Sequence, residues 1–422
     1  MKIGFIGLGK LGLPCALSIA LKGHEVIGHD INKEVSNYIK NMEVPYKEGG
    51  PNGEPSMNPF FKNANLKFGT FSDVVLESEI IFVAVQTPHD SKFEGITRLV
   101  GDRCDFNYSY LVESMKNINE EVEKIGKNKI VVIVSTVLPG TLRKYIFPVI
   151  GNKIKLCYNP FFIAMGTTMK DFLHPEFTLF GVVDDEASIK VEEFYKTIHN
   201  APFYKTTLEN AELIKVSYNS FIGLKIIFAN TIMEICHKTQ GTDCDSVVEA
   251  LFLAKDRLIS NKYLYGGMGD SGGCHPRDNI ALSWLAKELN LSHNVFEDMM
   301  KCREDQTEWL VNIIKEYKNK NEYLDVVILG LAYKPETNLT VGSCSVLLSN
   351  LLKEYNIKHD VYEPYHNAEE NRIQKNCKKA IYFIGTKHNF FKDWTFENGS
   401  IVIDPFRYIK EQDGIEVVRI GS

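Results

Sequence analysis

A glycine-rich segment in the second half of the chain carries the residue best suited to covalent chemistry. Gly272 and Gly273 precede Cys274, and Pro276 follows two residues later. Proline is favoured in the first turn of a helix, so we expect a helix to begin near Pro276, with the cysteine at its start. A helix dipole favours the thiolate there, which is the nucleophilic form. We interpret Cys274 as a nucleophile; the alternative is an inert core cysteine.

The first residues of the chain carry a second chemical signature. Gly7, Gly9 and Gly12 form a G-x-G-x-x-G sequence between a short apolar run and a stretch with helical spacing. These glycines allow a tight turn, a close approach of a pyrophosphate, and close packing of helix on strand. Asp30 ends the next expected strand, where a carboxylate binds ribose hydroxyls and repels a 2′-phosphate. We predict NAD as the cofactor; the alternative is a glycine turn that binds no dinucleotide.

Strands and helices of an α/β protein are predicted around both signatures. Residues 80–85 and 130–134 are continuous apolar runs, as expected of central parallel strands. Residues 209–237 are apolar on several faces and predict one long buried helix. From residue 325 the alternation of strand and helix restarts, which predicts a second parallel sheet.

The predicted fold class is therefore α/β, with two Rossmann-like, doubly wound parallel sheets joined by the long helix and a small helical domain. The predicted boundaries are residues 1–200 for an NAD-binding domain, 201–310 for a helical dimerisation domain, and 311–422 for a substrate-binding domain. Long loops over residues 48–59 and 88–105 lie near strand ends, where loops of this length are often functional. Simple insertions are the alternative.

Composition excludes several classes of function. The 422 residues carry a net charge of −6, which disfavours a nucleic-acid partner. The nine cysteines show no Cys-x-x-Cys pair, so we predict reduced thiols in the cytoplasm and no metal site. We expect no membrane association, because no uninterrupted apolar run reaches the length of about 20 residues that spans a bilayer. We expect no secretory signal, because the first residues enter a strand-like apolar run over residues 2–7.

Motifs along nearly the whole chain resemble those of the UDP-glucose/GDP-mannose dehydrogenases. They include the N-terminal fingerprint, Ser135 to Thr141, Glu212 to Lys215 with Asn219, the Gly-Gly-Cys segment ending at Asp278, and Gly330 to Thr337. The resemblance implies oxidation of the C6 hydroxymethyl of a nucleotide sugar to a carboxylate with two NAD per sugar. We also expect a homodimer formed through the long helix, with substrate between the two Rossmann-like domains at the carboxyl ends of their strands.

The resemblance assigns roles to further residues. Cys274 would form a thiohemiacetal and then a thioester, which water hydrolyses. Lys215 and Asn219 stand four residues apart and would stabilise a developing oxyanion, although a snorkelling lysine and a structural amide are the alternatives. Asp278 with the Thr136 hydroxyl would hold a water, although Asp278 could instead serve only as a first-turn acid.

The expected binding sites follow from the same motifs. The expected cofactor-binding residues are Gly7, Gly9, Lys10, Leu11, Gly12, Asp30, Thr87, Pro88, Thr136 and Arg277. The expected substrate-binding residues are Phe161, Phe162, Lys215, Asn219, Arg257, Gly272, Gly273 and Lys334.

The chain departs from the family where substrate is handled. Phe161 and Met165 stand where the family usually carries two glutamates, the first of which does acid–base work in thioester hydrolysis. Val341 stands where the family usually carries an arginine that reaches the diphosphate, so a bidentate clamp is lost. General acid–base help contributes typically ~10²–10⁴-fold, so we expect a slow final step, or one carried by Asp278 or another carboxylate such as Glu176.

Three hypotheses remain open from the sequence. The first, which we favour, is an NAD-dependent nucleotide-sugar 6-dehydrogenase, with a UDP-sugar as the expected substrate. The second is a catalytically impaired paralogue that binds NAD and a nucleotide sugar without full turnover. The third is a two-electron hydroxyacid-type dehydrogenase, against which the second sheet and the Gly-Gly-Cys segment argue.

Overall fold

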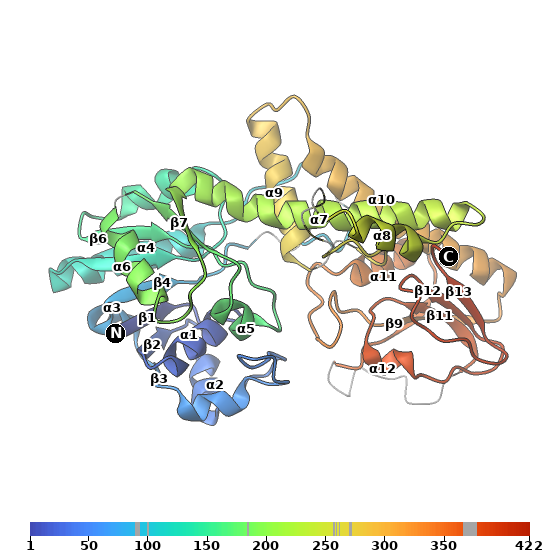
Figure 1. The fold of residues 1–422 in the computed structure, drawn as a ribbon, viewed down its shortest axis with the longest axis horizontal. Coiled ribbons are helices and arrows are strands. Elements are labelled where there is room, and N and C mark those ends of the chain that lie inside the picture. Colours follow the sequence, from blue (N-terminus) through green and yellow to red (C-terminus); the bar gives the residue numbers. More distant parts are fainter. Residues whose placement is uncertain are drawn as a thin grey trace. The chain divides into compact units, whose positions relative to one another are not determined.

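The computed structural model describes residues 1–88, 93–98, 101–183, 185–255, 258, 260, 262–269, 272–365 and 378–422. The chain divides into two compact units. The first consists of residues 1–88 and 106–217, and the second of residues 89–105 and 218–422. Each unit contains its own sheet, and both sheets are visible in Figure 1.

The sheet of the first unit has eight strands in the order β3-β2-β1-β4-β5-β6-β7-β8. All neighbours are parallel except β6 and β7, where Cys157 pairs with Val182 in antiparallel register. The order of the first six strands is that of dinucleotide-binding sheets, which bind their ligand where the order reverses, between β1 and β4. The strands are β1 (Lys2–Ile6), β2 (Glu25–His29), β3 (Leu66–Phe68), β4 (Ile80–Val83), β5 (Lys129–Ile133), β6 (Ile154–Tyr158), β7 (Thr178–Val182) and β8 (Phe203–Thr207).

Apolar side chains of the central strands and of α1 form the core of this unit. Every residue of α1 from Gly12 to Ala20 is buried, and Phe5 of β1 stacks on Phe82 of β4 with ring centroids 5.1 Å apart. The helices of the first unit are α1 (Gly12–Leu21), α2 (Glu34–Asn41), η1 (Asn58–Asn63), α3 (Phe71–Glu77), α4 (Ser109–Ile125), η3 (Leu142–Ile146), η4 (Phe147–Val149), α5 (Thr168–Leu173) and α6 (Asp185–Tyr195).

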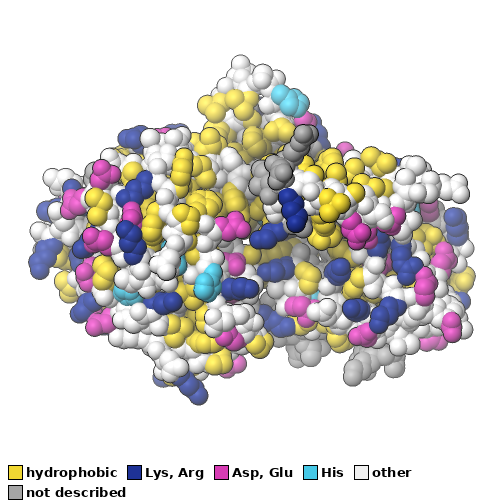
Figure 2. Space-filling model, in the orientation of Figure 1, with side chains coloured by type: hydrophobic (Ala, Val, Ile, Leu, Met, Phe, Trp, Pro, Cys, Tyr) yellow, Lys and Arg dark blue, Asp and Glu magenta, His cyan; other side chains and the backbone are white. Residues whose placement is uncertain are grey.

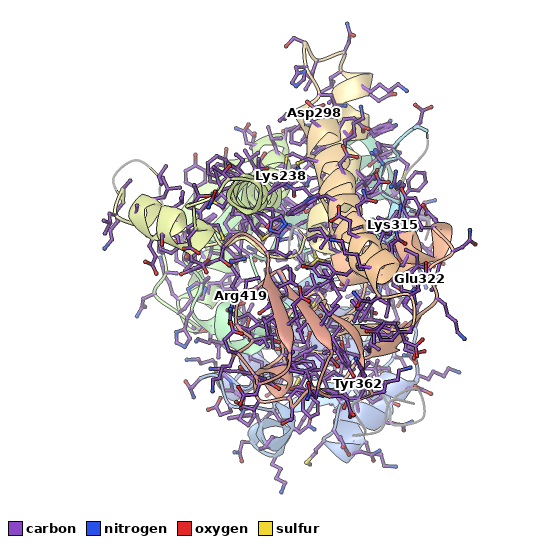
Figure 3. All side chains as sticks on the ribbon, turned by 90° about the vertical axis from the view of Figure 1, so that its right-hand side faces the viewer. Lys238, Asp298, Lys315, Glu322, Tyr362 and Arg419 are labelled. Atoms are coloured by element: carbon purple, nitrogen blue, oxygen red, sulfur yellow. The ribbon has the colours of Figure 1, made fainter. Side chains whose placement is uncertain are left out.

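The sheet of the second unit is wholly parallel, with five strands in the order β10-β9-β11-β12-β13. This confirms the prediction of a second parallel sheet. The strands are β9 (Asp325–Leu329), β10 (His359–Tyr362), β11 (Ala380–Ile384), β12 (Ile401–Asp404) and β13 (Glu416–Arg419). Figure 3 views these strands from the side, with Tyr362 at the end of β10 and Arg419 at the end of β13.

The long helix α7 (Leu208–Lys238) extends one residue beyond the predicted range at each end. The division between the two units falls within it, after Ser217. Among the described residues, α7 is the one helix long and apolar enough to cross a membrane, but buried helices of soluble proteins meet the same criterion. The other helices of the second unit are α8 (Cys244–Phe252), α9 (Cys274–Glu288), α10 (Val295–Lys320), α11 (Cys344–Glu354) and α12 (Asn389–Lys392).

Helix α9 begins two residues earlier than predicted. Its first residue is Cys274 itself, preceded by Gly273 as the N-cap, and Pro276 lies inside the first turn. Helix α10 was not predicted. Figure 3 shows α10 lengthwise, from Asp298 in its first turns to Lys315 near its end.

Candidate active site

The glycine turn after β1 has the geometry that close contact with a dinucleotide requires. Gly7 has φ +94°, and a methyl group there would lie 2.7 Å from the carbonyl oxygen of Ala84. A methyl group on Gly12 would lie 2.0 Å from the carbonyl oxygen of Gly7, whereas one on Gly9 would meet no atom within 4 Å. Gly7 and Gly12 are therefore required by the fold, and Gly9 keeps open space beside the backbone.

Asp30 lies at the end of β2 beside this turn. Its carboxylate accepts the N–H of Leu8 at 2.7 Å and the N–H of Asn32 at 2.8 Å. These bonds fix the acid next to the glycines, and the N-cap residue of α1, Leu11, makes no side-chain cap hydrogen bond. An open backbone at Gly9, a helix start with no side-chain cap and a fixed carboxylate together fit NAD. Lys10 is exposed at the same turn, 5.9 Å from the ring centroid of Tyr46.

Hydroxyl groups join the loops that follow β4 and β5. The Thr87 hydroxyl donates to the carbonyl oxygen of Thr136 at 2.8 Å, and the Ser135 hydroxyl donates to that of Val85 at 2.6 Å. The predicted residues Thr87 and Thr136 are thus brought together, and Pro88 follows in the same loop. The Thr87 hydroxyl therefore has a structural partner of its own.

Glu212 of α7 holds the continuation of the Thr136 loop. Its buried carboxylate accepts the N–H of Gly140 at 2.5 Å and the N–H of Leu142 at 2.9 Å. Burial raises the pKa of Glu212 to about 7, and the two N–H bonds offset part of that rise.

The loop over residues 48–59 is anchored by a buried acid that the sequence analysis missed. Glu48 accepts the N–H of Gly166 at 2.9 Å and both the N–H and the hydroxyl of Thr168, at 2.7 and 2.9 Å. It therefore fixes the loop over residues 48–59 to the end of the loop that contains Phe161 and Met165, next to the start of α5. In the sequence, Glu48 is one acidic residue before Gly49 and Gly50, and this pattern does not indicate a buried anchor.

Lys215 lies against that same loop. Its ammonium donates to the carbonyl oxygen of Phe161 at 2.8 Å and lies 5.0 Å from the ring centroid of Phe162. The ring of Phe161 lies 5.4 Å from that of Phe172, and the ring of Phe162 lies 4.8 Å from that of Phe177. These rings line a small hollow of about 30 Å³. Glu176 is exposed in the loop between α5 and β7.

In the second unit, Cys274 is exposed at the first position of α9. Asp278 lies one turn later and is fully buried, and its Oδ2 accepts the amide of Asn219 at 2.7 Å. Its Oδ1 is also buried and has no hydrogen-bond partner among the described residues. The structure thus brings together the predicted residues Asn219, on α7, and Asp278, which follows Cys274 by four residues on α9.

The glycines before Cys274 lie in close contact with the loop after β9. A methyl group on Gly272 would lie 2.7 Å from the ring of Tyr333, and one on Gly273 would lie 2.7 Å from the carbonyl oxygen of Val341. Val341 itself is exposed. The predicted residue Arg277 is partly exposed, with its Nε 4.0 Å from Asp278. Arg257 lies outside the described residues.

A second glycine turn follows β9 and repeats the geometry of the first. Gly330 has φ +92°, and Glu363 at the end of β10 accepts the N–H of Leu331 at 2.7 Å and of Ala332 at 3.1 Å. Burial pulls the pKa of Glu363 upward, but the hydrogen bond from His388 and these N–H bonds hold it below its ordinary value.

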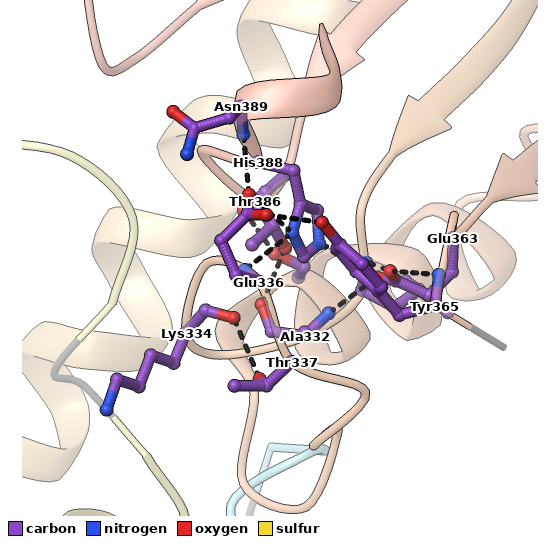
Figure 4. A network of polar contacts seen from close by, with 12 residues as sticks. Ala332, Lys334, Glu336, Thr337, Glu363, Tyr365, Thr386, His388 and Asn389 are labelled. Carbon is purple, nitrogen blue, oxygen red and sulfur yellow. Dashed lines mark hydrogen bonds and ion pairs between the residues drawn. The ribbon is translucent and has the colours of Figure 1, made fainter. Parts of the chain in front are cut away.

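Buried His388 is a further hydrogen-bond partner of Glu363. The N–H of Glu336 donates to its Nδ1 at 2.9 Å, so the ring proton is on Nε2, which lies 3.2 Å from Glu363. Figure 4 shows this network, with the side chain of Lys334 pointing away from it. Glu363 therefore has a side-chain partner, His388, in addition to backbone N–H groups, whereas Asp30 accepts from two backbone N–H groups.

Comparisons with known proteins place the chain in a family. Residues 1–199 match the NAD-binding domain of the UDP-glucose/GDP-mannose dehydrogenase family, and residues 209–305 match its central domain. GDP-mannose 6-dehydrogenase of Pseudomonas aeruginosa is 29% identical over 392 residues, 90% of this chain and 85% of the relative. UDP-glucose 6-dehydrogenase of Rickettsia conorii is 27% identical over an alignment covering 100% of both chains.

Solved structures agree on the fold. The structure of a UDP-glucose dehydrogenase from Pyrobaculum islandicum has a TM-score of 0.84 at 24% identity, covering 100% of this chain and 97% of that one. The structure of a UDP-D-ManNAc dehydrogenase from Pyrococcus horikoshii has a TM-score of 0.81 at 23% identity, covering 100% of this chain and 99% of that one.

Proposed function

Because the chain belongs to the UDP-glucose/GDP-mannose dehydrogenase family and NAD is its cofactor, we propose that it oxidises the C6 hydroxymethyl of a nucleotide sugar to a carboxylate through Cys274. The observation that carries the proposal is an exposed thiol at the first position of α9 with a buried carboxylate one turn away. A UDP-sugar is the expected substrate.

The proposed reaction consumes one alcohol, two NAD⁺ and one water, and yields one carboxylate, two NADH and three H⁺. NAD, when bound at the glycine turn, supplies the hydride acceptor for both oxidations. The Cys274 thiolate adds to the aldehyde carbon after the first oxidation and forms a thiohemiacetal. The second oxidation gives a thioester, and water then cleaves the C–S bond and restores the thiol. Covalent capture keeps the aldehyde from escaping.

Polar residues of both units are proposed to assist. The Lys215 ammonium and the Asn219 amide would stabilise the negative oxygen that forms when sulfur or water adds to the carbonyl. Asp278 already holds the Asn219 amide through Oδ2, which fixes the direction of that donor. Its buried Oδ1, without a hydrogen-bond partner among the described residues, supports a role in holding the attacking water with the Thr136 hydroxyl.

Phe161 favours a second candidate function, an enzyme that stalls before hydrolysis. Its ring contacts other aromatic rings at the position where the family usually carries a glutamate, so no carboxylate from residue 161 can activate the water. This chain would then accumulate a thioester on Cys274, or bind NAD and a nucleotide sugar without steady turnover.

A stoichiometric assay separates these candidates. The enzyme is mixed with NAD⁺ and a panel of UDP-glucose, UDP-N-acetylmannosamine and GDP-mannose, and NADH is measured per sugar consumed. Two NADH per sugar, lost in Cys274→Ser, is the expected result. One burst of NADH with a stable sugar adduct on Cys274 by mass spectrometry would favour the stalled enzyme. Full four-electron turnover by Cys274→Ser would refute the thiol mechanism.

We further propose that two copies associate through α7. Phe221, Leu224, Phe228 and Ile235 recur at helical spacing and are each between 41% and 51% exposed. Figure 2 shows hydrophobic side chains gathered over the surface where α7 and α8 lie in Figure 1. An exposed apolar stripe of this kind is typical of a protein–protein contact.

A further inference from the structure

Arg303 of α10 is a charged side chain that the proposed reaction does not use. It is buried, with 2% of its surface exposed. Its guanidinium donates to the carbonyl oxygen of Gly342 at 2.9 Å and also to that of Gly95. Placing a guanidinium in the interior is costly unless it is hydrogen-bonded, and its planar fork fixes the groups that it binds.

Both of these carbonyl groups belong to segments that touch the first turn of α9. A methyl group on Gly342 would lie 2.3 Å from Cα of Gly273, and one on Gly95 would lie 2.7 Å from Cβ of Pro276. Gly273 and Pro276 stand on either side of Cys274 in the sequence. One guanidinium therefore holds the two backbone segments between which the cysteine turn is seated.

We propose that Arg303 is the positioning residue for Cys274. It fixes Gly342 and Gly95, and these fix the turn that carries the sulfur. The inference rests on the proposed function and goes beyond it, because it names the group that keeps the thiol where the aldehyde forms. Loss of the clamp would leave the turn free to shift, and a displacement of about 1 Å costs up to ~100-fold in rate.

The proposal has a chemical signature that a general loss of stability lacks. If the sulfur is misplaced, the first oxidation still occurs but the aldehyde is no longer captured. The ratio of NADH to sugar then falls from two towards one, and free aldehyde appears in solution.

The test compares Arg303→Met and Arg303→Lys with Lys129→Met. Lys129 is a matched control, because its buried ammonium also donates to two carbonyl groups, those of Leu76 and Ser78, in the first unit. With UDP-glucose and GDP-mannose as probes, one measures kcat, NADH per sugar, and aldehyde trapped by hydroxylamine. Hydrogen exchange of the peptide over residues 272–280 reports the turn without any turnover.

For Arg303→Met we expect a ~10- to 100-fold lower kcat, a ratio of NADH to sugar well below two, and faster exchange at residues 272–280. Arg303→Lys, which keeps a donor, should recover part of each effect, and it decides the question if Arg303→Met does not fold. Effects equal to those of Lys129→Met, or faster exchange with kcat and the ratio intact, would overturn the proposal. If the wild-type enzyme makes no NADH, the proposed function fails, and the exchange result alone decides whether Arg303 holds the turn.

Discussion

Glu212 shows how one buried acid can make the stability of this protein depend on pH. Its pKa of about 7 in the folded chain lies above its ordinary value of 4.5, because burial disfavours the ionised form. The folded state therefore keeps a proton that the unfolded state loses between these two values. Stability is highest below pH 4.5 for this group, falls as the pH rises towards 7, and levels off above it.

Glu212→Gln should remove this dependence. We expect the wild-type free energy of unfolding to fall between pH 5 and 8 relative to that of the variant, by at most about 3 kcal/mol. The glutamine loses one of the two N–H bonds at every pH, which lowers its whole curve by a constant amount. Urea unfolding at pH 5, 6.5 and 8 gives both curves, and parallel curves would show that the carboxyl does not titrate in this range.

At the same scale, the sequence revealed which residue types occur but not always what they do. Cys274 was found because glycines and a proline surround it, and Asp30 because its spacing from Gly12 is diagnostic. Arg303 could not be found, because a charged residue in a charged helix usually faces water. Lys215 and Asn219 were predicted as a pair, but the structure gives each its own partner, Phe161 and Asp278.

In the segment formed by β1, the glycine turn and α1, different glycines serve folding and cofactor binding. A methyl group on Gly12 would overlap the carbonyl oxygen of Gly7, whereas one on Gly9 meets nothing in the folded chain. Gly12→Ala should therefore destabilise the protein without cofactor, by roughly 2 kcal/mol or more. Gly9→Ala should leave that stability unchanged and weaken NAD binding at least ~10-fold, because its methyl enters the space for the pyrophosphate.

Thermal unfolding without cofactor and calorimetric titration with NAD distinguish the two variants. Equal losses of stability, or unchanged NAD affinity in Gly9→Ala, would contradict the assignment of this space to the cofactor.

Among the elements, continuous apolar strands and the long apolar helix were predictable from the sequence. The runs at β4, β5 and β11 are apolar at nearly every position, which is typical of interior parallel strands, and the structure buries them. The antiparallel direction of β7 could not be predicted, because a strand pattern carries no sign of its direction. Helix α10 was missed because three of its nine buried residues, Arg303, Glu304 and Thr307, are polar and interrupt the apolar stripe between Met300 and Leu310.

At the scale of the whole molecule, the proposed association through α7 can be tested directly. Phe228 is 49% exposed near the middle of the stripe, and a carboxylate there would oppose burial against a second copy. We expect Phe228→Glu to shift the protein from dimer to monomer in sedimentation at micromolar concentration. Leu76→Glu, at a residue of α3 that is 59% exposed, is the control and should leave the mass unchanged. A monomeric wild-type protein would reject this interface.

The acids beside the two glycine turns have different hydrogen-bond partners, and this difference bears on turnover. In both sheets an acid lies at the end of the second strand, beside the turn. Glu363 is hydrogen-bonded to His388 and to backbone N–H groups, whereas Asp30 accepts from two backbone N–H groups. In the described part of the second unit, Glu363 thus binds protein groups in place of the hydroxyl groups of a ribose. A four-electron oxidation would then require one exchange of cofactor partway through each cycle. In that interval, the carbon–sulfur bond to Cys274 would be the tether that prevents a half-oxidised sugar from diffusing away.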